Sequence, residues 1–308
     1  MPANKKANPL EIFGVEKSYG ATQALKGLSF KLEEGTCTGL LGPNGAGKTT
    51  ACHIISGLLK ADAGKVLIHG LSFDVSREKI LSQIGVQLQE SRFYEKFTVE
   101  ETFNLFASFY PSCLDLDELL TKLSLTSYRK KRLGQLSGGL KQRVYIGCAL
   151  VHDPQLLILD EPMTSLDPIS QQEVRNLIKQ LKDLGKTILI STHNIDEAEK
   201  LCGQVLILDK GKILCQGNPR ELVETVCGKE MLTFNIENEE KYSQIKSKLS
   251  WLPEFSKRER GIGTDEGSLY LQELTRVSKE IGVDISHLSL RPTNLEDVFF
   301  YVTGRSFV

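Results

Sequence analysis

The sequence predicts an α/β protein. Its core would be a mostly parallel sheet around a phosphate-binding loop, with an antiparallel β subdomain, an inserted helical subdomain and a small C-terminal α+β domain. A glycine-rich stretch at 42–50 stands between a strand pattern and a helix pattern. Strand and helix patterns then alternate along the chain. Leu156–Leu159 and Ile188–Ile190 are continuously apolar, as in strands buried on both faces of a parallel sheet.

The elements near the N-terminus are predicted from alternation and helical spacing. Apolar residues alternate through 10–32 on both sides of Tyr19-Gly20, which predicts antiparallel strands joined by a turn. A strand is expected at 36–41, and 51–59 has the spacing of one helix face. Further strands are expected at 65–68, 84–88, 156–159, 187–191, 205–208 and 212–215, with an amphipathic helix at 174–184.

The segment from 92 to about 153 differs from this α/β pattern. Aromatic residues crowd 93–110, and helix patterns follow at 116–125 and 141–151. We therefore expect a helical insertion within the core. Its first helix is predicted to begin at a capping box formed by Thr98 and Glu101.

The aromatic residues of this insertion fall into two groups. Phe103 and Phe106 lie inside the predicted helix and are expected in the insertion's own core. Phe93, Tyr94 and Phe97 precede the helix and are expected to form an apolar contact surface for a partner.

A second domain is predicted over residues 226–308, after a first domain of residues 1–225. Strands are expected at 232–236, 255–258, 268–271 and 285–290, with helices near 242–252 and 274–281. This β-α-β-β-α-β order predicts a ferredoxin-like arrangement. A last helix is expected to start at a capping box formed by Thr293 and Glu296.

Composition narrows the class of protein. The formal net charge of -1 gives no general attraction to nucleic acid, and the basic run Arg129–Arg132 has no aromatic stacking platform beside it. We therefore expect no nucleic-acid partner. The 7 cysteines are scattered and form no C-x-x-C pair, which argues against a disulfide framework and against a zinc site. No run approaches the ~18 apolar residues of a membrane span, and the N-terminus lacks a signal-peptide core, so a cytoplasmic location is expected.

The glycine-rich stretch carries the chemistry of nucleotide binding. It reads Gly42, Pro43, Asn44, Gly45, Ala46, Gly47, Lys48, Thr49 and Thr50, which fits G-x-x-x-x-G-K-[ST] at every fixed position. Glycines allow close backbone approach, and a helix N-terminus favours negative charge. Lys48 is expected to reach the β- and γ-phosphates of ATP, and the Thr49 hydroxyl to ligate Mg²⁺. These residues predict a P-loop NTPase core.

Two carboxylates follow the apolar strand at 156–159. Asp160 ends the strand and is expected at the Mg²⁺ ion, while Glu161 would polarise the attacking water. Phosphoryl transfer needs in-line positioning and charge neutralisation, which a carboxylate at this place supplies. The alternative is that the acidic pair caps the next helix.

The octapeptide Leu136–Arg143, which contains Ser137, Gly138 and Gly139, lies between these two motifs in the chain. The phosphate loop, this Ser-Gly-Gly segment and the acidic strand end, in this order, resemble the ATP-binding cassette (ABC) family. The resemblance extends from Ile12 to about Val226. It implies that Ser137–Gly139 is the signature loop, which binds ATP held by the other cassette of a dimer.

The resemblance implies further site residues. Tyr19 would stack on adenine, Asp167 would communicate across the dimer, and His193 would hold the γ-phosphate. Tyr19 could instead be a turn aromatic that covers the core edge, and a histidine such as His193 is often structural. Gln89 would contact the metal and couple to the membrane subunit; Gln87 is the other candidate, but Gln89 is preferred because it follows the strand.

The chain also departs from the family pattern. Leu140 replaces a common glutamine, and Ser165 stands where glycine is frequent. The ending Arg291–Phe299 resembles the closing motif of drug- and polysaccharide-exporting members, which carry a C-terminal extension.

This resemblance implies an ATPase that drives export. It would act as a head-to-tail homodimer, or with a related cassette, on separate membrane-spanning permease subunits at the inner face of the cell membrane. The alternatives are a soluble cassette ATPase of DNA repair or translation and a nucleotide-binding regulator without turnover. Repair types usually carry a long coiled coil and translation types two cassettes, and neither feature is present here.

Overall fold

The computed structural model describes residues 7–89, 93–236, 239–252 and 261–303. Its contacts divide the chain into two compact units, Met1–Gln216 and Gly217–Val308. Each unit has its own sheets and its own hydrophobic core.

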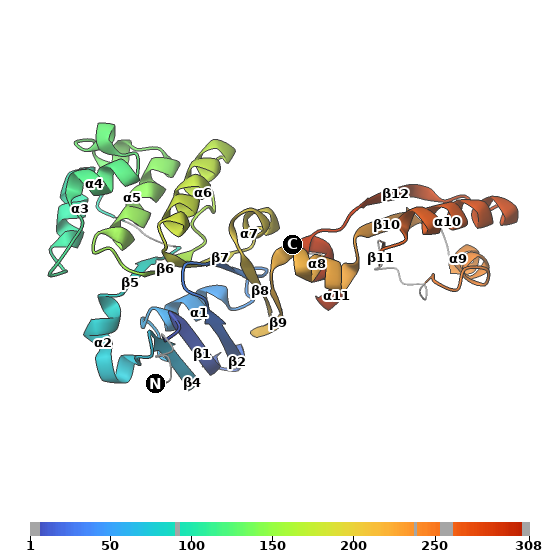
Figure 1. Cartoon of the computed structure of the whole chain (residues 1–308), viewed down its shortest axis with the longest axis horizontal. Helices are drawn as coiled ribbons and strands as arrows, with labels where there is room; N and C mark the ends of the chain where they lie inside the picture. Colours follow the sequence, from blue (N-terminus) through green and yellow to red (C-terminus); the bar gives the residue numbers. More distant parts are fainter. Residues whose placement is uncertain (1–6, 90–92, 237–238, 253–260, 304–308) are drawn as a thin grey trace, which may run out of the picture. The chain divides into compact units, whose positions relative to one another are not determined.

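The N-terminal unit is built on a six-stranded sheet in the order β5-β6-β7-β3-β8-β9 (Figure 1). All four strand pairs from β5 to β8 are parallel, which is the pairing that the apolar runs predicted. The strands are β5 (Ile84–Gln87), β6 (Leu156–Asp160), β7 (Thr187–Thr192), β3 (Cys37–Leu41), β8 (Gln204–Asp209) and β9 (Lys212–Gly217). Because neighbouring parallel strands end at the same edge, their following loops are brought together.

A second, antiparallel sheet has the order β2-β1-β4. It consists of β1 (Leu10–Tyr19), β2 (Thr22–Leu32) and β4 (Ala63–Ile68). Helix α1 (Lys48–Ile55) packs against β2 and also against β6 and β7, so one buried core joins both sheets. Helix α2 (Phe73–Leu81) packs on β4 and β5, and α6 (Pro168–Asp183) packs on α7 (Ile195–Leu201).

The helical insertion contains α3 (Val99–Ala107), α4 (Leu116–Lys122) and α5 (Gly138–Leu150). The predicted capping box is present: the Glu101 N–H donates to Thr98 Oγ1, and the Thr98 N–H donates to Glu101 Oε2. Short 3₁₀ turns η1 (Thr126–Tyr128) and η2 (Leu133–Gln135) precede α5.

The aromatic residues of the insertion are divided differently from the prediction. Phe103 is buried, as expected. Phe93 is also half-buried, because its ring packs against Phe106 and Tyr145 at centroid distances of 5.2 and 4.8 Å. Of the three residues expected to form a contact surface, only Tyr94 and Phe97 are exposed.

The basic run in the insertion is partly neutralised by neighbouring carboxylates. Arg129 Nη2 lies 2.6 Å from Glu100 Oε1, and Arg129 Nη1 lies 2.5 Å from Asp117 Oδ1. These pairs tie α3 and α4 to the turn that follows them.

In the C-terminal unit, β10 (Glu230–Asn235) pairs antiparallel with β11 (Ile262–Thr264) on one side and β12 (Ser286–Pro292) on the other. Helices α9 (Glu239–Lys246) and α10 (Gly267–Ile281) supply one core, which includes Leu232, Ile245, Leu274 and Val277. Helices α8 (Pro219–Cys227) and α11 (Leu295–Thr303) pack against each other.

One of the strands expected in this unit was wrong. The strand expected at 268–271 is the first part of α10, because the helical spacing of Leu274 and Val277 extends back through Tyr270 and Leu271. The strand expected at 255–258 lies outside the described residues. The sheet therefore has three strands in the described part of this unit, where the ferredoxin-like prediction had four.

Two boundaries also differ from the prediction. The division between units precedes 217, and not 226, because α8 packs with α11. The last helix is capped by Asn294 and Asp297, which exchange reciprocal hydrogen bonds, and not by Thr293 and Glu296. Thr293 Oγ1 instead donates to the Gly228 carbonyl.

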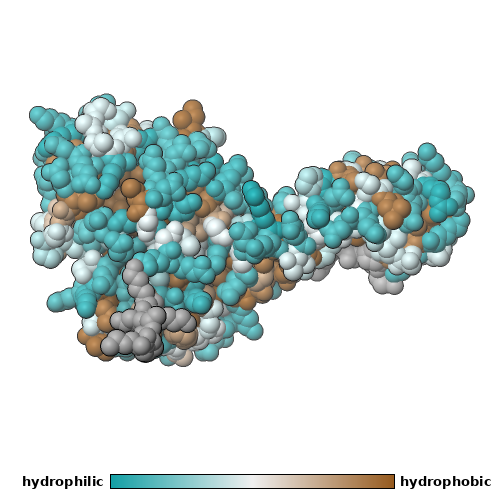
Figure 2. Space-filling model, in the orientation of Figure 1, coloured by the Kyte–Doolittle hydropathy of each residue, from teal (hydrophilic) through white to brown (hydrophobic). Residues whose placement is uncertain are grey.

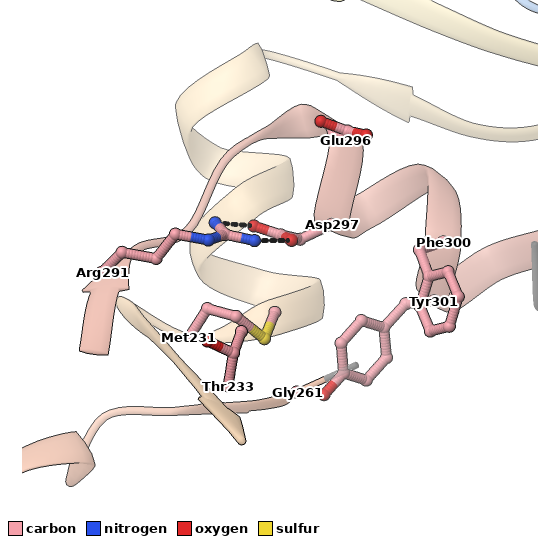
Figure 3. Close-up of a pocket in the computed structure, with 8 residues that line it drawn as sticks. All are labelled: Met231, Thr233, Gly261, Arg291, Glu296, Asp297, Phe300 and Tyr301. Atoms are coloured by element: carbon pink, nitrogen blue, oxygen red, sulfur yellow. Dashed lines mark hydrogen bonds and ion pairs between the residues drawn. The ribbon is translucent and has the colours of Figure 1, made fainter. Parts of the chain in front are cut away.

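Helix α11 and the sheet enclose a pocket in the C-terminal unit (Figure 3). Its polar wall is an ion pair in which Arg291 Nη1 and Nη2 donate to both carboxylate oxygens of Asp297, at 2.8 and 2.7 Å. The other lining residues are Met231, Thr233, Gly261, Glu296, Phe300 and Tyr301. Because Asp297 also caps α11, this pair fixes the helix to the strand that precedes it.

Within the described ranges, no helix is both long and apolar enough to cross a membrane. The face of the N-terminal unit seen in Figure 2 is mostly hydrophilic, with small apolar groups between the polar side chains.

Two phenylalanines of the same segment provide a test of the insertion's core. Phe103 is 1% exposed and packs against Gly147, whereas Phe109 is 68% exposed. Phe103→Ala leaves a cavity and should lower the free energy of unfolding by about 3–5 kcal/mol. Phe109→Ala is the matched control and should change it by less than about 1 kcal/mol. Urea unfolding followed by circular dichroism measures both, and equal losses would contradict this assignment of the core.

Candidate active site

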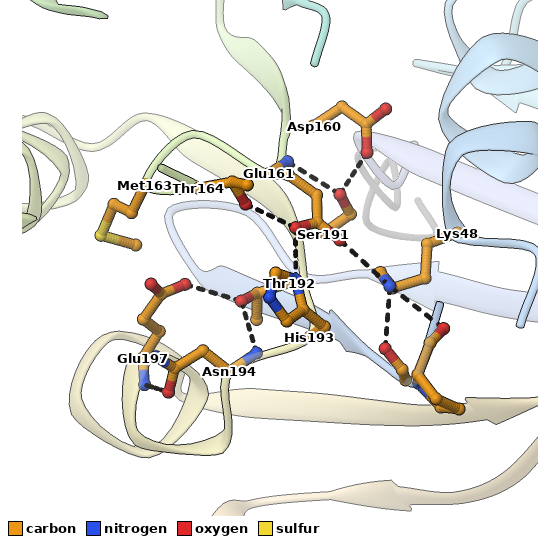
Figure 4. Close-up of polar contacts among 12 residues, drawn as sticks. Lys48, Asp160, Glu161, Met163, Thr164, Ser191, Thr192, His193, Asn194 and Glu197 are labelled. Atoms are coloured by element: carbon orange, nitrogen blue, oxygen red, sulfur yellow. Dashed lines mark hydrogen bonds and ion pairs between the residues drawn. The ribbon is translucent and has the colours of Figure 1, made fainter. Parts of the chain in front are cut away.

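The candidate site lies at the carboxyl edge of the parallel sheet (Figure 4). Strand β3 leads into the phosphate loop, β6 ends at Asp160, and β7 ends immediately before His193. Because β6, β7 and β3 are consecutive in the sheet, side chains from three distant parts of the sequence meet there. This is the edge at which open α/β sheets bind ligands.

The phosphate loop connects β3 to α1 through glycines that the local geometry requires. A Cβ on Gly42 would lie 2.3 Å from the Leu208 carbonyl oxygen, so no larger residue fits. Gly47 has a φ of 109° and caps α1, which places the N-terminus of that helix at the site. The first backbone N–H groups of α1 have no partner within the helix, and so are suited to an anion.

Lys48 is directed into the site and is 5% exposed. Its Nζ donates to the carbonyl oxygens of Gly42 and Pro43 at 2.8 and 3.2 Å, and lies 3.1 Å from Glu161 Oε1. These contacts hold an ammonium group within the loop predicted to bind phosphates. They also connect the phosphate loop directly to the acidic end of β6.

Asp160 has the properties expected of a metal ligand. It is buried, and its Oδ1 accepts a short hydrogen bond from Ser191 Oγ. Its Oδ2 is also buried but has no hydrogen-bond partner in the part of the chain that the structure describes. Buried polar atoms are nearly always paired, so this oxygen is available to a cation. Mg²⁺ binds through oxygen ligands of this type, and the residues present therefore fit it.

The two candidate glutamines have different environments. Gln87 is the last residue of β5 and is 2% exposed, with its Nε2 donating to the Leu88 carbonyl at 2.7 Å. The same Nε2 lies 3.5 Å from the Asp160 carbonyl, and Gln87 Oε1 is buried without a partner among the described residues. Gln89 lies after the strand, at the start of the loop, and is exposed.

Glu161 lies at the centre of the polar contacts. It has a φ of 50°, a strained conformation for a residue with a side chain, and is fixed by donating its N–H to Ser191 O and Oγ. Its Oε2 lies 2.5 Å from His193 Nδ1 and accepts a hydrogen bond from Thr164 Oγ1 at 2.6 Å. The acidic pair is therefore not simply a helix cap: α6 is capped by Asp167.

These contacts set the charge of Glu161. Burial raises the pKa of its carboxyl. The Thr164 hydroxyl and the Lys48 ammonium together lower this pKa by more than burial raises it, so it lies below its ordinary value. Glu161 is an ionised carboxylate at neutral pH and can accept a proton. Sequence reasoning did not identify Thr164. The only signal was a hydroxyl residue three positions after the acidic residue, where a tight turn can bring it back.

The signature loop and the segment after Glu161 pack against each other. Ser137 caps α5, and Gly139 is so close to α6 that a Cβ there would lie 2.4 Å from Ser170 Oγ. Ser170 Oγ in turn donates to Asp167 Oδ2 at 2.6 Å. Asp167 caps α6 by accepting the N–H groups of Ile169 and Ser170. The two segments predicted to act across a dimer therefore form one packed group.

The remaining predicted residues are placed as follows. Ser137 and Gly138 are exposed on α5, at the insertion and not in the cluster around Glu161. Tyr19 ends β1 and is 51% exposed, so its ring is accessible to an adenine. Ser165 has a φ of 64°, which explains on physical grounds why glycine suits this position.

Comparison with known proteins gives a consistent picture. A family model described as ABC transporter matches residues 25–164. The Nod factor export ATP-binding protein I of Rhizobium sp. (strain N33) is 34% identical, over 96% of this chain and 97% of that protein. The protein of the same name from Rhizobium meliloti (strain 1021) is 33% identical, over 99% of this chain and 91% of its own length.

Solved structures are similar to about two thirds or more of the chain. An ATP-binding cassette of an ABC transporter in its ADP conformation has a TM-score of 0.64 at 27% identity, covering 71% of this chain and 94% of that chain. A dimeric cassette in a post-hydrolysis state, bound to ADP and Pi, has a TM-score of 0.60 at 26% identity, covering 68% of this chain and 98% of that chain.

The Thr164 contact can be tested by two substitutions. Thr164→Val removes the hydrogen bond to Glu161 and should lower the rate of ATP hydrolysis about tenfold. Because that bond lowers the pKa of Glu161, its loss should move the acid limb of the pH–rate profile to higher pH. Thr164→Ser keeps the hydroxyl and is the control. A Val variant with the rate and pH profile of the wild type would show that the contact has no role.

Proposed function

This chain belongs to the ABC transporter family as an ATP-hydrolysing subunit, and we propose that it works as a head-to-tail homodimer on separate membrane-spanning subunits. In each of the two sites one chain would contribute its phosphate loop, Asp160, Glu161 and His193. The partner chain would contribute Ser137, Gly138 and Gly139. A soluble cassette ATPase of DNA repair or translation is disfavoured, since two relatives that match nearly the whole chain are named for export.

The observation that carries this proposal is the arrangement around Glu161. An ionised carboxylate lies between Lys48 and His193, and the preceding residue, Asp160, has a buried oxygen without a hydrogen-bond partner among the described residues. Phosphoryl transfer needs such a group to orient water and accept its proton. The exposure of Ser137 and Gly138, away from this cluster, supports their action on a second copy. A cassette with the same fold has been solved as a dimer with ADP and Pi.

We assign each side chain one role in hydrolysis. The backbone of 42–47 and the ammonium of Lys48 hold the β- and γ-phosphates. Glu161 orients the attacking water and takes its proton, and His193 contacts the γ-phosphate. Tyr19 stacks on the adenine. Thr49, Asp160 and Gln89 would hold Mg²⁺, which supplies neutralisation of the phosphate charge when bound.

The direction of transport is proposed from the relatives. Two relatives that match nearly the whole chain are named as export proteins, so we propose that this subunit also serves export. Its membrane-spanning partners would hold it at the cytoplasmic face of the membrane. The C-terminal unit, with its own core, is proposed to be an accessory domain of this exporter type.

The proposal is tested first by separating ATP binding from cleavage. Glu161→Gln removes the proton acceptor and should lower ATP hydrolysis by at least about 10²-fold, while ATP still binds. The variant should then accumulate as an ATP-bound dimer in size-exclusion chromatography with light scattering. Hydrolysis at the wild-type rate would show that Glu161 is not the base.

The Glu161→Gln variant can also be used to distinguish the contributions of the two chains to one ATP site. Adding Ser137→Arg to Glu161→Gln should abolish the dimer but leave ATP binding by the monomer intact. Lys48→Ala should abolish binding itself, because the phosphates lose their main point charge. A signature variant that loses ATP affinity as severely as Lys48→Ala would contradict the head-to-tail site.

The exposed aromatic residues Tyr94 and Phe97 are the proposed contact with the membrane subunit. Their rings pack on each other at 5.2 Å, and both remain exposed at the start of the insertion. Replacing both with Ala should leave hydrolysis by the isolated chain near wild type but release it from membranes that contain its partner. Leu184→Ala, at a residue 62% exposed elsewhere in the N-terminal unit, is the control. Normal membrane association of the double variant would place the contact elsewhere.

A further inference from the structure

A buried carboxylate outside the predicted site lies in the turn beyond His193. Glu197 belongs to the first turn of α7 and is only 5% exposed. Its Oε2 accepts a hydrogen bond from Thr192 Oγ1 at 2.6 Å. Burial raises the pKa of this carboxyl, partly offset by the Thr192 hydroxyl. Burying a carboxyl group costs free energy, and an acidic residue exposed at the start of a helix avoids that cost. We therefore expect the buried Glu197 side chain to have a further role.

The hydrogen bonds of Glu197 connect it to Thr192 and Asn194, the residues on either side of His193 (Figure 4). The Asn194 N–H donates to Thr192 Oγ1 at 2.9 Å, and the Glu197 N–H donates to Asn194 Oδ1 at 3.3 Å. Together with the bond from Thr192 to Glu197, these contacts fix the backbone on both sides of His193. The histidine is thus held in a turn whose shape depends on three side chains.

Thr192 also reaches the phosphate loop. Its carbonyl oxygen accepts the Gly42 N–H at 3.2 Å, at the point where β3 ends and the loop begins. This backbone bond does not involve the Thr192 hydroxyl, so we expect the start of the phosphate loop to stay in place when only the hydroxyl contact is lost. Glu197 is the group that holds the Thr192 side chain from the α7 side.

We propose that Glu197 is a positioning residue: by accepting the Thr192 hydroxyl, it holds the β7–α7 turn so that His193 Nδ1 stays against Glu161 Oε2. This inference rests on the proposed function, because it takes His193 and Glu161 to act in hydrolysis. The role requires a hydrogen-bond acceptor at 197 and does not require its charge. Glu197→Gln keeps an acceptor, whereas Glu197→Ala and Thr192→Val each break the bond.

The kinetic test compares these three variants with a double variant. Glu197→Ala should lower kcat about 10- to 100-fold, the scale for a small misplacement of reacting groups, and should change the KM for ATP by less than about threefold. Thr192→Val should do the same, and the double variant should be no worse than either, because both act through one bond. Glu197→Gln should restore most of the activity. Additive losses, or a Gln variant as slow as Ala, would overturn the proposal.

A spectroscopic readout separates positioning from general stability. The chain has 5 histidines, so the ring resonances in a ¹H–¹³C spectrum of the full chain can be assigned individually. Glu197→Ala and Thr192→Val should shift the His193 ring resonance and leave the other four in place, and Glu197→Gln should not shift it. An unchanged His193 resonance in both disrupting variants would overturn the proposal. If Glu197→Ala does not fold, Thr192→Val decides alone.

His193→Ala distinguishes failure of this inference from failure of the proposed function. If His193→Ala hydrolyses ATP at the wild-type rate, the proposed role of His193 is wrong, and the inference fails with it. If His193→Ala is inactive while Glu197→Ala and Thr192→Val are fully active, only the positioning role is wrong.

Discussion

The parallel pairing of β6, β7 and β3 is the constraint on which the site depends. Each strand ends at the same edge, and each is continued by a segment with a different chemical role. Asp160, His193 and the phosphate loop could not meet if one of these strands ran the other way. Every residue of these three strands is buried, so a slip of one residue would move each side chain to the opposite packed face, where it meets different neighbours.

The centre of the site was predictable because its residues are tied to strand ends and to a loop of fixed length. The phosphate loop, Asp160, Glu161 and His193 each follow an apolar run that can be read directly. Thr164 and Glu197 were not predictable in the same way. Their contacts depend on how a turn folds back on itself, and a threonine or glutamate after a strand end has many possible partners.

In the smaller unit, the type of one element could not be predicted from the sequence pattern. Residues 268–271 alternate enough to suggest a strand, but they continue the helical spacing of α10. Pattern alone could not decide between the two periods over four residues, whereas in the folded unit Tyr270 and Leu271 pack against its hydrophobic core from a helix. The same holds for Phe93, whose position before a helix suggested exposure although Phe106 and Tyr145 cover part of it.

The close approach of Gly139 to Ser170 has a consequence for how this protein could evolve. Helix α5, which begins at the signature loop, packs so closely on the start of α6 that no side chain fits at position 139. They are far apart in the sequence, with β6 between them. In a recombinant chain that takes α5 from one protein and α6 from a related one, the two packing surfaces have not been selected to fit each other. Recombination between related genes is therefore tolerated best when α5 and α6 are exchanged together.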